Sequence, residues 1–158
     1  MRMRALETKV FMNKNRSIVR WTISWACLAA ALGLHVVDEA VNGFLPLYNS
    51  VIESWRETYG WVPFPTFTFA AWLGGLITLV MVLFALTPLV PRGYRWLRGL
   101  SYFLGTLMIA NALGHISISI SLREFAPGVY SSPVLLLAAI ALLVTTKQSR
   151  ISPEISDA

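Results

Sequence analysis

The stretch FTFAAWLGGLITLVMVLFALTPLV, residues 67–90, contains no charged side chain and decides the fold class. A transmembrane helix needs about 20 consecutive, mostly apolar residues, so this stretch predicts a membrane-spanning helix. Three further apolar stretches, at residues 20–42, 99–122 and 127–146, meet the same requirement. The sequence therefore predicts an all-α fold, an integral membrane bundle of four transmembrane helices.

The composition of the whole chain agrees with a membrane protein. Of its 158 residues, 56% are hydrophobic and only 13% are charged, whereas a soluble domain needs roughly a quarter charged residues. A single cysteine, Cys27, excludes an intrachain disulfide and a cluster of thiolate metal ligands. The net charge of +5 comes from basic residues that flank apolar segments, which favours a role in topology over nucleic-acid binding. We therefore expect membrane lipids, and no nucleic acid, as partners.

Lys and Arg residues gather on one side of the predicted bundle. They occur in the N-terminal segment 1–19, between the second and third spans, and in the tail 147–158, whereas the other side has only Arg56 and Arg123. Since positively charged segments stay in the cytoplasm, we expect both termini to be cytoplasmic, in a multi-pass protein of the plasma (inner) membrane. A cleaved signal peptide is the competing interpretation of the first apolar stretch, which is long for one.

Aromatic residues are expected to mark both membrane interfaces, because their amphipathic rings favour the headgroup level. The connection between the first and second spans, residues 43–65, is rich in them and is expected to be a partly ordered outer loop. Trp21, Trp25 and Trp96 are expected to anchor the helices at the inner interface.

Apart from hydroxyl groups and the residues at the span ends, five polar side chains lie inside the predicted spans, where ionisable groups are costly and by default mark a functional site. The first span carries His35, Asp38 and Glu39, and the third carries Asn111 and His115. His35 and Glu39 are four residues apart, as are Asn111 and His115, so each pair shares one helix face. At about 1.5 Å per residue, His35 lies about 22 Å along its helix and His115 about 25 Å along its own. Two spans that run in the same direction therefore bring these residues to one level, where we expect a polar pocket.

The residue types of this pocket are compatible with two kinds of chemistry. Two imidazoles with one or two carboxylates, here His35, Asp38, Glu39 and His115, match the ligands of zinc or non-haem iron. Without a metal, a histidine and a glutamate would serve as general acid and base, and His35, Glu39 and His115 are the catalytic candidates. Asp38 is then a further ligand or an orienting group, and Asn111 is a hydrogen-bond donor.

Several residues near the outer ends of the spans are further candidates. Ser119 lies one turn beyond His115 on the same face, although its hydroxyl could instead bond a helix carbonyl. Arg123 could clamp an anionic head group or anchor the helix, and Tyr130 and Ser131 could reach the pocket from above. The substrate-binding candidates are thus Asp38, Asn111, Ser119, Arg123 and Tyr130.

The pattern favours an enzyme or binding protein that acts on a lipid or another apolar small molecule, with a divalent metal such as zinc or iron as the candidate cofactor. If the protein is an enzyme, the residue types favour a hydrolase or an isomerase. One alternative is a proton-coupled carrier, which at this length would have to form a homo-oligomer. The other is a structural membrane protein whose polar groups only pair its helices.

Three short motifs occur in order between about residues 30 and 145. They are His35-Val36-Val37-Asp38-Glu39, Asn111-x-x-x-His115, and Pro127-Gly128 followed by Ser131-Ser132. In these motifs the chain resembles the HXXEE-domain family of integral membrane proteins, with Asp38 in place of the family's usual first Glu. The resemblance implies a compact helical membrane domain in which these polar residues form a shared site, and it implies no particular reaction.

Overall fold

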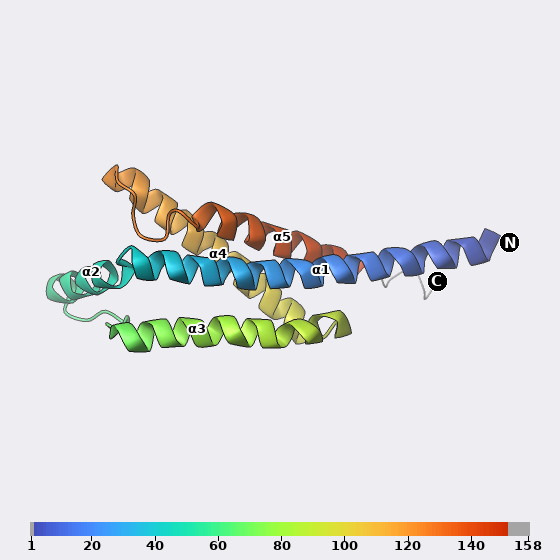
Figure 1. Ribbon diagram of the computed structural model, residues 1–158, viewed down its shortest axis with the longest axis horizontal. Helices are drawn as coiled ribbons and strands as arrows, with labels where there is room; N and C mark the ends of the chain where they lie inside the picture. Colours follow the sequence, from blue (N-terminus) through green and yellow to red (C-terminus); the bar gives the residue numbers. More distant parts are fainter. Residues whose placement is uncertain (1, 152–158) are drawn as a thin grey trace.

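The chain folds into five α-helices and one short 3₁₀ helix in the computed structural model (Figure 1), which describes the backbone of residues 2–151 and the side chains of residues 12–149 other than Lys14. The elements are α1 (Arg2–Val41), α2 (Phe44–Tyr59), α3 (Phe69–Leu86), η1 (Thr87–Arg92), α4 (Arg95–Leu122) and α5 (Ser132–Ile151). No strand occurs in the described part of the chain, so the predicted all-α fold is confirmed.

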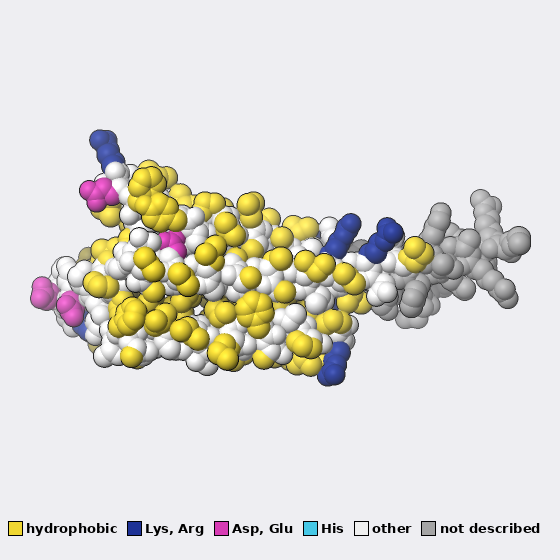
Figure 2. Space-filling view, in the orientation of Figure 1, with side chains coloured by type: hydrophobic (Ala, Val, Ile, Leu, Met, Phe, Trp, Pro, Cys, Tyr) yellow, Lys and Arg dark blue, Asp and Glu magenta, His cyan; other side chains and the backbone are white. Residues whose placement is uncertain are grey.

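Four helical segments are long and apolar enough to cross a membrane, which confirms the predicted four spans. They are Asn15–Val41, Phe69–Arg92, Arg95–Leu122 and Ser132–Ser149. Hydrophobic side chains cover the flank of the bundle, while most of the Lys and Arg side chains in view lie toward the end with the N-terminus (Figure 2). The flank is therefore suited to contact with lipid.

Helix α1 is central to the bundle. It packs against both α5 and α3, and α4 packs against α5 (Figure 1). The α4–α5 contact is close, because a Cβ added to Gly105 would lie 2.6 Å from Cδ2 of Leu143 and 3.4 Å from the carbonyl oxygen of Ala139. Lipid tails are as apolar as the side chains, so close packing of this kind, rather than water exclusion, holds membrane helices together.

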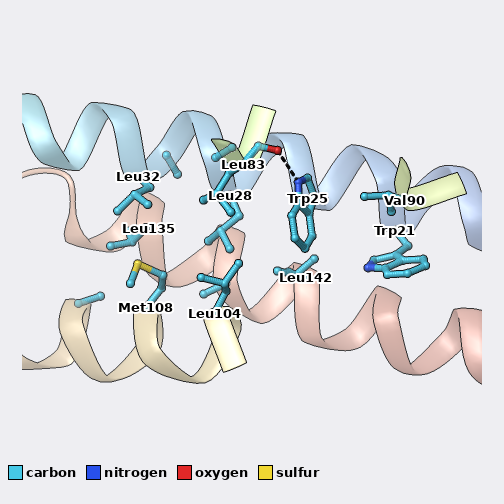
Figure 3. Packing of buried hydrophobic residues seen from close by; sticks show 14 of the residues in the cluster. Trp21, Trp25, Leu28, Leu32, Leu83, Val90, Leu104, Met108, Leu135 and Leu142 are labelled. Atoms are coloured by element: carbon cyan, nitrogen blue, oxygen red, sulfur yellow. Dashed lines mark hydrogen bonds between the residues drawn. The ribbon is translucent and has the colours of Figure 1, made fainter. Parts of the chain in front are cut away.

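Two tryptophans of α1 belong to the hydrophobic core between the helices (Figure 3). Trp21 and Trp25 are 0% and 2% exposed, which corrects the prediction that they anchor the interface; Trp96 is half-exposed. The indole N–H of Trp21 donates to Oγ of Ser101 over 3.0 Å, and that of Trp25 donates to the carbonyl of Leu83 over 2.9 Å. These bonds satisfy each indole N–H, as its burial requires, and join α1 to α4 and α3.

The connection between the first two spans contains the helix α2, where the sequence predicted a partly ordered loop. Gly43 and Gly60 flank it, both with a φ of 78°, a left-handed conformation that glycine adopts without strain. Leu45 and Ile52 are buried, while most of the other side chains are exposed. This one-sided burial is typical of a short amphipathic helix at the end of a bundle.

The linker Arg123–Ser131 between α4 and α5 folds back toward α1. Helix α5 begins at Ser132, within the predicted span 127–146, because Pro127 and Gly128, with a φ of 85° at the glycine, lie in a turn. The turn brings Ser131, the last residue of the linker, beside the end of α1, where Asp38 lies.

Candidate functional site

Three ionisable side chains from two helices meet inside the bundle. His35 and Glu39 lie on successive turns of α1, and His115 comes from α4. Oε1 of Glu39 lies 3.4 Å from Nε2 of His35 and 3.1 Å from Nε2 of His115. All three residues are buried, with 1% of His35, 5% of Glu39 and 4% of His115 exposed. The spacing along α1 and the common direction of α1 and α4 (Figure 1) bring the three together.

The contact of His115 with the linker fixes the position of its ring proton. Nδ1 of His115 lies 2.6 Å from the carbonyl oxygen of Pro127. A carbonyl oxygen only accepts hydrogen bonds, so Nδ1 carries the proton. In the neutral ring, Nε2 therefore presents a lone pair, and its neighbour is the Glu39 carboxylate.

His35 is held in the same tautomer through Ser131. Nδ1 of His35 lies 2.8 Å from Oγ of Ser131, and this hydroxyl donates to Oδ2 of Asp38 over 2.7 Å. A serine hydroxyl has one proton, so Oγ of Ser131 accepts the second bond from Nδ1–H of His35. Nε2 of His35 is buried and has no hydrogen-bond partner among the described residues.

Asp38 is the anchor of this chain of hydrogen bonds. Its Oδ2 also accepts the backbone N–H of Ser131 over 2.8 Å, and its Oδ1 accepts from Nδ2 of Asn42 over 2.7 Å. Asp38 thereby ties the start of α5 to α1. Its carboxylate lies outside the group of ligand atoms formed by His35, Glu39 and His115.

Two imidazole nitrogens and one carboxylate oxygen thus face one another. The three atoms lie within 4.8 Å of one another. Ligand atoms that bind one Zn²⁺ at about 2.0–2.2 Å are separated from each other by about 3.0–3.5 Å, which matches both distances measured from Glu39. Metal-bound histidines also donate their second N–H to a carbonyl or to another fixed acceptor, as His115 and His35 do. The three residues therefore have the ligand types of a divalent-metal site and, for the distances from Glu39, its spacing.

Aromatic and small residues enclose the two imidazoles. The rings of His35 and His115 meet edge to face with their centroids 4.9 Å apart, and the ring of Phe44 lies 5.3 Å from that of His115. Gly128 approaches His115 so closely that an added Cβ would lie 2.7 Å from Nδ1. Electrostatic interactions are stronger in such surroundings than in water, so the group of lone pairs should attract a cation strongly.

The other residues that the sequence analysis singled out lie around this group. Asn111 is one turn before His115 on α4, and its buried Oδ1 has no partner among the described residues. Ser119 accepts a backbone N–H of the linker over 2.9 Å and, with Arg123, lines a separate cavity of about 280 Å³. Tyr130 is exposed on the linker. Substrate binding by these residues stays a prediction.

Several contributors to the geometry had little signal in the sequence. Ser131 stood out only as a hydroxyl near the pocket, because its bridge between Asp38 and His35 depends on the path of the linker. The carbonyl of Pro127 is a backbone group, which residue types cannot reveal. Asn42 lies four residues after Asp38, and helical spacing alone would predict that contact.

A family model described as a protein of unknown function with an HXXEE motif matches residues 25–143. The matched region covers most of the chain and includes His35, Glu39 and His115, and the chain belongs to this family. No curated protein and no solved structure matches it.

Proposed function

We propose that this member of the HXXEE family is a membrane-embedded metalloprotein in which His35, Glu39 and His115 bind a divalent metal such as zinc or iron. The orientation of the imidazoles carries the proposal. Both Nδ1 protons are engaged by other partners, Pro127 and Ser131, so both Nε2 atoms remain for Glu39 and a metal. Two histidines and one carboxylate are a common ligand set of zinc and of non-haem iron.

An ion pair between Glu39 and His115, without a metal, explains less of this geometry than a bound metal does. One proton between Glu39 and His115 would form such a pair over 3.1 Å. It would leave Nε2 of His35 buried and without a hydrogen bond, although the same carboxylate oxygen lies 3.4 Å away. An unsatisfied buried polar atom is costly, whereas a metal ion would engage all three atoms at once.

The ligand set favours a role in binding or catalysis over a purely structural metal site. Three protein ligands leave a coordination position for another molecule, as in catalytic zinc sites. A divalent ion would supply Lewis-acid chemistry here, by polarising a carbonyl or phosphoryl group. Because the ligands lie in helices that can span a membrane, the proposed substrate is a lipid or another apolar small molecule, and the proposed reaction is a hydrolysis or an isomerisation.

Metal analysis of the purified protein tests the proposal. The protein is incubated with Zn²⁺ or Fe²⁺ and passed through gel filtration in detergent, and its metal content is then measured by inductively coupled plasma mass spectrometry. We expect about one metal ion per chain. The chain contains only two histidines, so His35→Gln and His115→Gln each remove an imidazole that has no substitute. Both variants, and Glu39→Gln, should retain only background metal.

Glu124→Gln is the matched control for Glu39→Gln, because Glu124 is an exposed carboxylate on the linker. Its metal content should equal that of the wild type. Circular dichroism and thermal unfolding in the absence of metal establish that each variant is folded. Folded wild-type protein without a stoichiometric ion, or folded Glu39→Gln and His115→Gln variants that retain one, would show that the proposal is wrong.

Ser131→Ala is expected to weaken metal binding by about 10- to 100-fold while all three ligands stay in the chain. The change removes the acceptor of the His35 Nδ1 proton, so the ring is no longer held in one orientation. Competition with a chelator of known affinity measures the effect. Ser121→Ala is the control, since that hydroxyl only donates to the Ser117 carbonyl on an exposed face. Equal affinities of the two variants would contradict the role of Ser131.

A further inference from the structure

A recess of about 320 Å³ opens on the flank of the bundle, between the end of α1 and the linker that precedes α5. Its lining is partly apolar and partly polar: α1 supplies Leu34, Val37 and Val41, and the polar lining residues are Asp38, Asn42, Tyr130 and Ser131. Part of an acidic side chain is visible among hydrophobic side chains between α1 and the linker (Figure 2). A mainly apolar recess that contains a few polar groups is suited to the head of an amphiphile.

Asp38 is the only charged side chain in the lining of this recess. It is 9% exposed and accepts hydrogen bonds from Asn42 and Ser131. Among the residues whose side chains are described, the ion pairs involve Glu39, and Asp38 forms none. A carboxylate within a membrane span is costly and by default marks a functional site. A positively charged group in the recess would be attracted to this carboxylate, and an anionic group would be repelled.

An apolar groove of about 300 Å³ lies on the other side of Val37 and Val41, which line both cavities. Helix α3 provides the far wall of the groove with Leu73, Ile77, Val80 and Met81. A molecule that places a charged head beside Asp38 could therefore pass its chain over Val37 and Val41 into the groove.

We propose that the recess and the groove together bind a long-chain amine, with its ammonium group beside Asp38 and its alkyl chain between α1 and α3. Oδ1 of Asp38 accepts one hydrogen bond, from Asn42, and a carboxylate oxygen has capacity for a second, which the ammonium group would donate. The chain would contact only apolar side chains, as it does in lipid.

This binding site is distinct from the group of metal ligands. Asp38 and Ser131 lie on the Nδ1 side of His35, whereas Glu39 and His115 lie on its Nε2 side. The inference therefore does not depend on a bound metal. The amine should still bind to the metal-free Glu39→Gln variant, so a failure of either proposal can be told from a failure of the other.

Photolabelling of the full chain in phosphatidylcholine nanodiscs tests the inference. The probe is hexadecylamine with a photoreactive group in its chain, and the competitors are unlabelled hexadecylamine, hexadecanol and hexadecanoate. We expect labelled peptides from α1 and α3, competition by the amine, weaker competition by the alcohol and none by the carboxylate. Asp38→Asn should lower the apparent affinity about tenfold or more, a loss of about 1.4 kcal/mol.

Val37→Trp provides a second variant. It places a bulky side chain between the two cavities, both of which Val37 lines. Val37 is 58% exposed, so a larger side chain there need not disturb the core. Leu137→Trp, at a 69% exposed position of α5 outside both cavities, is the matched control. Labelling should fall in Val37→Trp and persist in Leu137→Trp. Equal competition by hexadecylamine and hexadecanoate, or unchanged labelling of folded Val37→Trp, would overturn the proposal.

Discussion

Gly128→Ala is expected to lower the metal affinity by about 100-fold, the upper end for a change that does not remove a ligand. The added Cβ would lie 2.7 Å from Nδ1 and 2.8 Å from Cε1 of His115. The imidazole cannot turn away easily, because Pro127 holds its Nδ1 and the ring packs against His35 and Phe44. Chelator competition measures the loss of affinity.

The same substitution also strains the backbone, since a left-handed conformation costs a non-glycine residue roughly 1–2 kcal/mol. Gly60→Ala separates the two effects: Gly60 has a φ of 78°, similar to the 85° of Gly128, but open space around an added Cβ. Gly60→Ala should lose stability and keep its metal affinity. A Gly128→Ala variant with the affinity of Gly60→Ala would show that the contact with His115 does not position the ring.

Gly105→Leu is expected to destabilise the bundle by about 3 kcal/mol, the upper end for overpacking of a core. At this position even a Cβ would meet Cγ of Leu143 at 2.7 Å and Cδ2 at 2.6 Å, so a leucine would push α4 and α5 apart. Reversible unfolding in mixed micelles with increasing sodium dodecyl sulfate measures the free energy of unfolding.

Gly99→Leu is the matched control on the same helix, because an added Cβ at Gly99 meets nothing within 4 Å. Its stability should stay close to that of the wild type. Leu143→Ala in the Gly105→Leu background should restore part of the lost stability, since it removes the atoms that clash. Equal stabilities of Gly105→Leu and Gly99→Leu would contradict the close α4–α5 contact.

The four spans could be predicted from the sequence because hydropathy over about 20 residues is a strong signal. Helix α2 could not, since its polar residues and its short length resemble an ordered loop. The burial of Trp21 and Trp25 was also missed: their positions near the basic end suggested the interface, whereas the bonds to Ser101 and Leu83 that allow burial come from distant helices.

The proximity of His35 and His115 could be predicted from their distance along each helix and from the common direction of the two helices, which can be read from each helix separately. The different contacts of Asp38 and Glu39 could not be predicted in the same way. Adjacent residues on a helix point about 100° apart, and the packing of the neighbouring elements decides which groups each side chain contacts. The roles of Ser131 and of the Pro127 carbonyl depend on the turn of the linker, which residue types do not determine.

The division of contacts between Asp38 and Glu39 implies different evolutionary freedom at two neighbouring positions. Asp38 contacts the linker and Asn42. If the side chain at position 38 becomes longer or shorter, the linker can shift to keep the contact. Glu39 contacts two imidazoles fixed on different helices, so a shorter side chain would withdraw from both at once. Sequence drift within the HXXEE motif should therefore fall on its first acidic position, where this chain carries an aspartate.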